Sequence, residues 1–150
     1  MDPFVSKYEA AQIIRVARFR AGVSWSQLAE AVGRDKEWTT AALLGSHALS
    51  AQEAAAIKEL LEGDEAVVEA LQMQPYRTGL AENIASDPTI YRFYEALQVY
   101  GPAMKELIHE EFGDGIMSAI NFNMIIQRRT DPGGDRVVVT LDGKFLDYNW

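Results

Sequence analysis

The sequence contains no cysteine and only two histidines among its 150 residues. The missing thiols exclude disulfides, cysteine nucleophiles and zinc sites built on Cys. His47 and His109 lie far apart and lack the i, i+4 spacing of a helical metal site. No group of acidic residues has ligand-like spacing either. We therefore expect neither a metal ion nor a bound cofactor.

Long apolar runs and positive net charge are also lacking. No stretch reaches the roughly 18 apolar residues that a membrane helix needs. The N-terminus shows no basic region followed by an apolar core, so we expect a soluble, cytoplasmic protein that binds no membrane. Residues 1–70 contain seven Lys and Arg against eleven Asp and Glu, and residues 71–150 contain the same numbers. Each half thus carries −4, and any anion chemistry must use local basic residues.

The N-terminal half shows five short amphipathic segments separated by turn residues. Ser24 with Gln27, and Ser50 with Glu53, form the capping-box pattern that begins a helix. The predicted helices span about 4–20, 25–33, 35–44, 51–63 and 64–73. The side chains expected in their common core are Trp25, Leu28, Trp38, Leu43 and Leu44.

Residues 24–45, SWSQLAEAVGRDKEWTTAALLG, have the length and small-residue turn of a helix-turn-helix motif. A non-catalytic DNA-binding regulator or assembly domain is therefore an alternative function. The would-be recognition helix opens with Asp35, Lys36 and Glu37, which places net negative charge where phosphates and base edges would approach. We expect no DNA binding.

Residues 72–88, QMQPYRTGLAENIASDP, contain two prolines, one glycine and no sustained apolar period. Such a composition is typical of a linker. We predict an N-terminal helical bundle over 1–74, a linker over 75–87 and a C-terminal domain over 88–150.

A helix is predicted to begin at Pro88, because the preceding Asp87 can accept free backbone N–H groups and Pro suits the first helical position. Gly101 is expected to stop this helix after Tyr100, and Pro102 to open a second, short one. Apolar residues lie on both sides of the first helix, so we expect both sides to be covered.

Arg92 and Glu95 lie one turn apart on this helix and are predicted to be paired and buried together. A buried pair can be purely structural. A partly desolvated guanidinium can equally bind a small carboxylate-like anion. The local pattern alone favours the structural hypothesis, since buried pairs also serve packing and register.

The C-terminal residues change to a period of two between Ile116 and Ile126, which is typical of an extended strand. TDPGGD at 130–135 is a strong reversal signal, so a hairpin is predicted over about 124–146. Asp142 and Gly143 predict a second turn, and residues 115–120 are compatible with a helical turn or a strand. Because a lone hairpin is marginal in water, we expect this half to complete its core in a partner subunit.

Ser118 lies in GDGIMSAIN, where Gly113 and Gly115 are expected to allow close approach of the backbone to another group. No Gly-x-Ser-x-Gly elbow surrounds Ser118, so we do not predict a nucleophile. Two hypotheses remain: a small polar residue in a tight corner, or a hydrogen-bond donor to an anion.

Four strings closely resemble the cyanase family, also called cyanate hydratase or cyanate lyase: AALLGSHALSAQEA, DPTIYRFYEALQVYG, HEEFGDGIMSAINF and VTLDGKFL. The resemblance covers the chain from end to end. It implies an enzyme that decomposes cyanate to carbamate and carbon dioxide with bicarbonate as co-substrate, carbamate then giving ammonia and carbon dioxide. The catalytic Arg, Glu and Ser of the family correspond without gaps to Arg92, Glu95 and Ser118.

The resemblance also implies dimers with intertwined C-terminal segments, which assemble into a homodecamer with active sites at subunit interfaces. On this interpretation Arg92 clamps a dianionic adduct and Ser118 donates hydrogen bonds to its oxygens, whereas Glu95 either orients Arg92 or transfers a proton. The predicted fold is mainly α with a small β part. It joins a helix-turn-helix-like bundle to an α+β catalytic and oligomerisation domain with a β-hairpin.

Overall fold

A computed structural model describes residues 4–76 and 82–149, with side chains described for 4–76 and 84–149. The chain divides into two compact units, Met1–Arg77 and Thr78–Trp150. This division falls within the predicted linker, of which residues 77–81 lie outside the described residues. Among the described residues, no helix is long and apolar enough to cross a membrane.

The first unit contains five short helices, as predicted. They are α1 (Lys7–Ala21), α2 (Trp25–Val32), α3 (Lys36–Leu43), α4 (Ala51–Leu61) and α5 (Glu65–Gln72). The capping boxes at Ser24 and Ser50 are confirmed, and a third one joins Ser6 to Glu9 at the start of α1. Each capping box provides acceptors for backbone N–H groups in the first helical turn, which have no partner within the helix. The local sequence therefore determines where these helices begin.

The core of the first unit lies between these helices, with α2 packed on both α3 and α4. Leu28 and Leu43 are fully buried, as predicted, and Trp25 and Trp38 pack partly buried against them. The prediction for Leu44 is wrong, because this residue is 46% exposed. Adjacent helical residues point about 100° apart, so the burial of Leu43 at the end of α3 turns Leu44 outward.

The second unit contains α6 (Glu82–Ala85), α7 (Pro88–Phe112), β1 (Gly115–Arg129) and β2 (Arg136–Asp147). Asp87 caps α7 as predicted, since its Oδ1 accepts the N–H groups of Thr89 and Ile90 at 2.9 and 3.2 Å.

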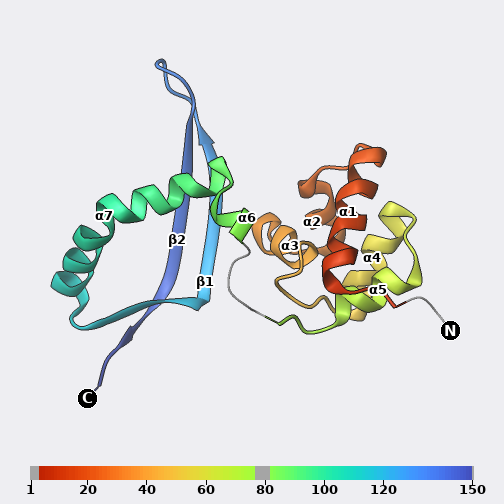
Figure 1. Ribbon diagram of the computed structural model, residues 1–150, viewed down its shortest axis with the longest axis horizontal. Coiled ribbons are helices and arrows are strands. Elements are labelled where there is room, and N and C mark those ends of the chain that lie inside the picture. Colours follow the sequence, from red (N-terminus) through yellow and green to blue (C-terminus); the bar gives the residue numbers. More distant parts are fainter. Residues whose placement is uncertain (1–3, 77–81, 150) are drawn as a thin grey trace. The chain divides into compact units, whose positions relative to one another are not determined.

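The predicted helix end at Gly101 is wrong, because α7 continues through Pro102 to Phe112. A residue before proline normally avoids helical dihedrals because its Cβ clashes with the proline ring, but Gly101 has no Cβ. Pro102 still removes one i to i−4 hydrogen bond, and Figure 1 shows α7 bending along its length.

The two strands form one antiparallel hairpin, with the predicted reversal at residues 130–135 confirmed. Figure 1 shows β1 and β2 side by side over most of their length. Residues 115–120 belong to β1 rather than to a helical turn. The second predicted turn is also wrong, because β2 runs straight through Asp142 and Gly143.

The register of this hairpin is interrupted once. Met117 pairs with Phe145, but the next aligned pair is Phe122 with Gly143. Four residues of β1, 118–121, therefore lie opposite the single residue Lys144 of β2. Such an insertion is a bulge, which bends a strand and re-aims its side chains.

The second unit buries very little. Between residues 84 and 149 only Gly115 and Ser118 are buried, and no apolar side chain is. Apolar side chains of α7 that are at least half exposed include Phe93, Leu97, Val99, Tyr100, Leu107 and Phe112. The covered helix that the sequence predicts is thus not formed by a single chain.

Candidate active site

Arg92 and Glu95 form an ion pair on the second turn of α7. Arg92 Nη1 donates to Glu95 Oε2 at 2.8 Å, so the predicted pairing is present. The predicted burial is wrong for the single chain, since the two side chains are 66% and 47% exposed. The physical reason is that no other element of this unit covers the helix at this point with buried side chains.

The Arg92 guanidinium keeps much of its binding capacity. Arginine has five N–H donors in a planar fork, and the one hydrogen bond to Glu95 uses Nη1. Within the described residues, Nε and Nη2 of Arg92 make no hydrogen bond, and its Cζ lies 6.0 Å from the centroid of the Tyr91 ring. Glu95 therefore fixes the fork while leaving donors for the oxygens of an anion.

Ser118 lies at the start of the bulge and is only 5% exposed. Its Oγ accepts the N–H groups of Ile120 and Asn121, at 3.0 and 2.9 Å. A hydroxyl has two lone pairs and one O–H group, so two accepted bonds leave the O–H as its remaining hydrogen-bonding function. Within the described chain Ser118 donates to no acceptor, which leaves this O–H for a ligand.

The two glycines near Ser118 have different roles. A Cβ at Gly115 would lie less than 3.0 Å from the Leu146 carbonyl oxygen and the Phe145 ring, so the predicted close approach is present there. Gly113 has open space around it, and the same prediction is wrong for it. Its φ of 92° shows that glycine is needed there for backbone conformation, where α7 ends.

His109 occupies the last turn of α7, and its side chain is 32% exposed. Its Nε2 lies 3.3 Å from the Gly115 carbonyl oxygen and 4.0 Å from Asp114 Oδ1. Throughout the described residues there is no group of three or more His, Asp or Glu side chains that could hold a metal ion.

The structure brings two of the three predicted catalytic residues together. Arg92 and Glu95 contact each other, whereas Ser118 makes its hydrogen bonds within β1. A cleft of about 360 Å³ between the second half of α7 and the start of β1 is lined by Lys105, His109 and Tyr148, among others, and by none of the three. The bulge that orients Ser118 was not predicted, because its position depends on pairing with a distant strand.

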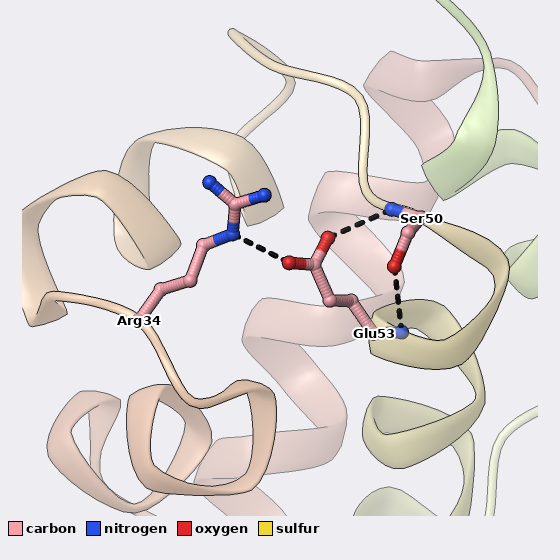
Figure 2. A network of polar contacts seen from close by, with 3 residues as sticks. All are labelled: Arg34, Ser50 and Glu53. Atoms are coloured by element: carbon pink, nitrogen blue, oxygen red, sulfur yellow. Dashed lines mark hydrogen bonds and ion pairs between the residues drawn. The ribbon is translucent and has the colours of Figure 1, made fainter.

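A second Arg–Glu pair, in the first unit, provides a contrast. Figure 2 shows Glu53 between Arg34 and Ser50, with one carboxylate oxygen accepting from Arg34 and the other from the Ser50 N–H. The Ser50 N–H is the main cause that holds the pKa of Glu53 below its ordinary value, and Arg34 adds to it. Arg34 also stacks on Trp38, with its Cζ 3.9 Å from the ring centroid. Both carboxylate oxygens of Glu53 accept hydrogen bonds from protein groups, so this pair is tied to the cap of α4 and is structural.

Two protein families match the chain in succession. The family described as "Cyanate hydratase, N-terminal" matches residues 7–75, and the family described as "Cyanate lyase C-terminal domain" matches residues 82–150. Together they cover nearly all of the chain, and the second includes Arg92, Glu95 and Ser118.

Individual relatives agree with these matches. The cyanate hydratase of Mycolicibacterium vanbaalenii is 55% identical over 146 residues, covering 97% of this chain and 95% of the relative. That of Thiobacillus denitrificans is 51% identical over 144 residues, covering 96% and 98%. The crystal structure of cyanase from T. urticae has a TM-score of 0.80 and 36% identity, covering 91% of this chain and 96% of that one. With both domain families and full-length relatives in agreement, the chain belongs to the cyanate hydratase (cyanase) family of enzymes.

Proposed function

We propose that this chain is a cytoplasmic enzyme that decomposes cyanate in a bicarbonate-dependent reaction. The products are carbamate and carbon dioxide, and carbamate then gives ammonia and a second carbon dioxide. The observation that carries the proposal is the full-length similarity to relatives named cyanate hydratase, at 51–55% identity for the two above. The alternative, a DNA-binding regulator, finds no support in these relatives.

The proposed reaction joins two small anions. An oxygen of bicarbonate attacks the carbon of cyanate, which forms a C–O bond and a dianionic adduct. Cleavage of the bond between this oxygen and the former bicarbonate carbon releases carbon dioxide and, with uptake of one proton, carbamate. A second proton and cleavage of the C–N bond then give ammonia and carbon dioxide. Because bicarbonate supplies the nucleophile, the protein's task is to bind, orient and neutralise.

Charge repulsion is the first obstacle that the protein must overcome. Two unit charges 4 Å apart repel by about 1 kcal/mol in water and about 4 kcal/mol at an effective dielectric constant of 20. The open donors of Arg92 are suited to offset this repulsion, and to hold the dianionic adduct by two parallel hydrogen bonds. Holding both reactants in place also removes much of the entropic barrier.

Ser118 and Glu95 complete the proposed site. The O–H of Ser118, directed by two accepted N–H bonds, is suited to donate to an oxygen of the adduct. Glu95 orients the Arg92 fork through the 2.8 Å ion pair. Its carboxylate can alternatively take up a proton from solvent and pass it to the adduct, supplying one of the two protons that the reaction consumes.

Assembly is part of the proposal, since water screens a guanidinium that is 66% exposed. The apolar side chains of Ala96 and Val99, which follow Arg92 on the same face of α7, are exposed in the single chain. We propose that a second copy covers them, so that each site forms at a subunit interface of a homo-oligomer. The full assembly is proposed to be a decamer built from dimers.

Ammonia release from cyanate, measured with and without added bicarbonate in carbon-dioxide-free buffer, tests this function. We expect release that depends on both anions. Absence of ammonia under all conditions would overturn the proposal. A salt-sensitive, sequence-dependent shift of duplex DNA, without ammonia release, would favour the DNA-binding alternative instead.

A further inference from the structure

The bulge that carries Ser118 depends on what lies opposite it. Residues 118–121 of β1 lie opposite the single residue Lys144 of β2. The backbone of these four residues therefore cannot follow the regular line of the strand. The Ser118 carbonyl is displaced toward β2, where it lies against Gly143.

Gly143 leaves no room for a side chain at this contact. A Cβ at position 143 would lie less than 3.0 Å from the Ser118 carbonyl oxygen and from Cγ of Met117. The methionine side chain can rotate away, but the carbonyl is part of the backbone of the bulge. The φ of Gly143 is not in the left-handed region, so this glycine is required for space rather than for conformation.

We propose that Gly143 is a positioning residue for Ser118, which rests on the function proposed above. By lacking a Cβ, Gly143 lets the Ser118 carbonyl approach β2, and the bulge can then place the N–H groups of Ile120 and Asn121 on Ser118 Oγ. These two bonds direct the Ser118 O–H toward the reacting anions. Gly143 itself touches no substrate.

Substitution Gly143→Ala should therefore move Ser118 without removing it. A misplacement on the order of 1 Å can cost about 100-fold in rate, so we expect kcat/KM to fall by about that factor. The variant should keep the oligomeric mass of the unmodified protein by light scattering.

A double-mutant cycle separates positioning from a general effect on the hairpin. Ser118→Ala removes the hydroxyl, and if Gly143 acts only through it, adding Gly143→Ala should then lower kcat/KM by less than about twofold more. Gly115→Ala is the matched control, because its Cβ would also lie less than 3.0 Å from a β2 carbonyl oxygen. Gly115→Ala should lower kcat/KM by the same factor whether or not the Ser118 hydroxyl is present.

A second variant covers the case in which Gly143→Ala fails to assemble. Met117→Ala with Gly143→Ala removes the side-chain part of the clash and leaves only the push on the Ser118 carbonyl. Compared with Met117→Ala alone, it should show the same loss of about 100-fold.

Two results would overturn the inference. One is a Gly143→Ala enzyme, correctly assembled, whose kcat/KM stays within about twofold of the unmodified protein. The other is an equal loss from Gly143→Ala in the presence and absence of the Ser118 hydroxyl. If Ser118→Ala is fully active, the positioning role fails while bicarbonate-dependent ammonia release still stands, so the two proposals fail separately.

Discussion

The two units of this chain differ in how they use their apolar side chains. The first unit, built from helices of 8 to 15 residues, encloses a core that includes Ile14, Leu28, Leu43 and Ile57. The second unit has the longest helix, of 25 residues, and strands of 15 and 12 residues, yet it buries no apolar side chain between residues 84 and 149. The length of a helix or strand therefore says little about how many apolar side chains it buries. The first unit closes its core within one chain, and the second presents surfaces for another.

The two Arg–Glu pairs repeat this difference. Both carboxylate oxygens of Glu53 accept hydrogen bonds, one from Arg34 and one from the Ser50 N–H, and the Arg34 guanidinium stacks on the Trp38 ring. Arg92 is held by Glu95 and keeps open donors. A pair that is tied into a helix cap and stacked on an aromatic ring stabilises a fold, whereas a guanidinium oriented only by its carboxylate partner is suited to bind an anion. The four predictions below test this comparison.

The largest expected effect concerns assembly. Because the second unit exposes apolar residues on both sides of α7, light scattering at micromolar concentration should give a mass several times 16.7 kDa. A stable and active monomer would contradict this difference between the two units, because the second unit would then be stable without a partner to cover its apolar side chains.

Core packing in the first unit should be the next largest effect. Leu28→Ala leaves a cavity at a fully buried site and should lower the free energy of unfolding by about 2–5 kcal/mol. The matched control is Leu44→Ala, at a leucine that is 46% exposed, with an expected change within about 0.5 kcal/mol. Urea denaturation of both variants, monitored by circular dichroism, would measure the change in the free energy of unfolding. Equal effects would contradict the assignment of the core.

Arg92→Lys tests the ion pair on α7. Lysine keeps the charge but loses the planar fork, so kcat/KM for cyanate should fall by about 100-fold or more in an assembled protein. Arg34→Lys, at the structural pair of the first unit, should leave kcat/KM nearly unchanged. Glu95→Gln should also lower turnover while the oligomeric mass stays the same. Normal bicarbonate-dependent turnover of Arg92→Lys would show that both pairs are structural.

Glu53→Gln should have the smallest effect. Gln27 makes the same backbone bond in its own capping box, so glutamine at position 53 loses mainly the charge. We expect the free energy of unfolding at pH 7 to fall by about 0.5–1 kcal/mol.

The pH dependence of that difference follows from the lowered pKa of Glu53 in the folded state. A lowered pKa contributes stability above the ordinary value of 4.5, and this contribution is lost as pH falls through the folded-state pKa. Urea unfolding of both proteins at pH 7 and at acidic pH should therefore show the difference disappearing below pH 4.5. A difference that grows in acid would contradict this account.

Features made by neighbours in sequence could be predicted for this protein. Capping boxes at Ser24 and Ser50, the Asp87 cap and the Arg92–Glu95 pair each join residues two or three positions apart. The reversal at residues 130–135 is equally local. Such features form once the backbone is helical or turned, whatever packs around them. The residue pattern and its spacing were therefore sufficient to predict them.

Tertiary structure alone decided the rest, because those features depend on residues far apart in the chain. Gly143 is a turn signal by composition, but pairing with β1 makes it the point where the Ser118 carbonyl approaches β2. The continuation of α7 through Gly101 and Pro102 is an exception, because its cause is local: Gly101 has no Cβ to clash with the proline ring. The exposure of Arg92 follows from what packs on α7, which no spacing within α7 encodes. Local hydrogen bonds determine where elements begin, whereas strand register and burial are set by long-range contacts.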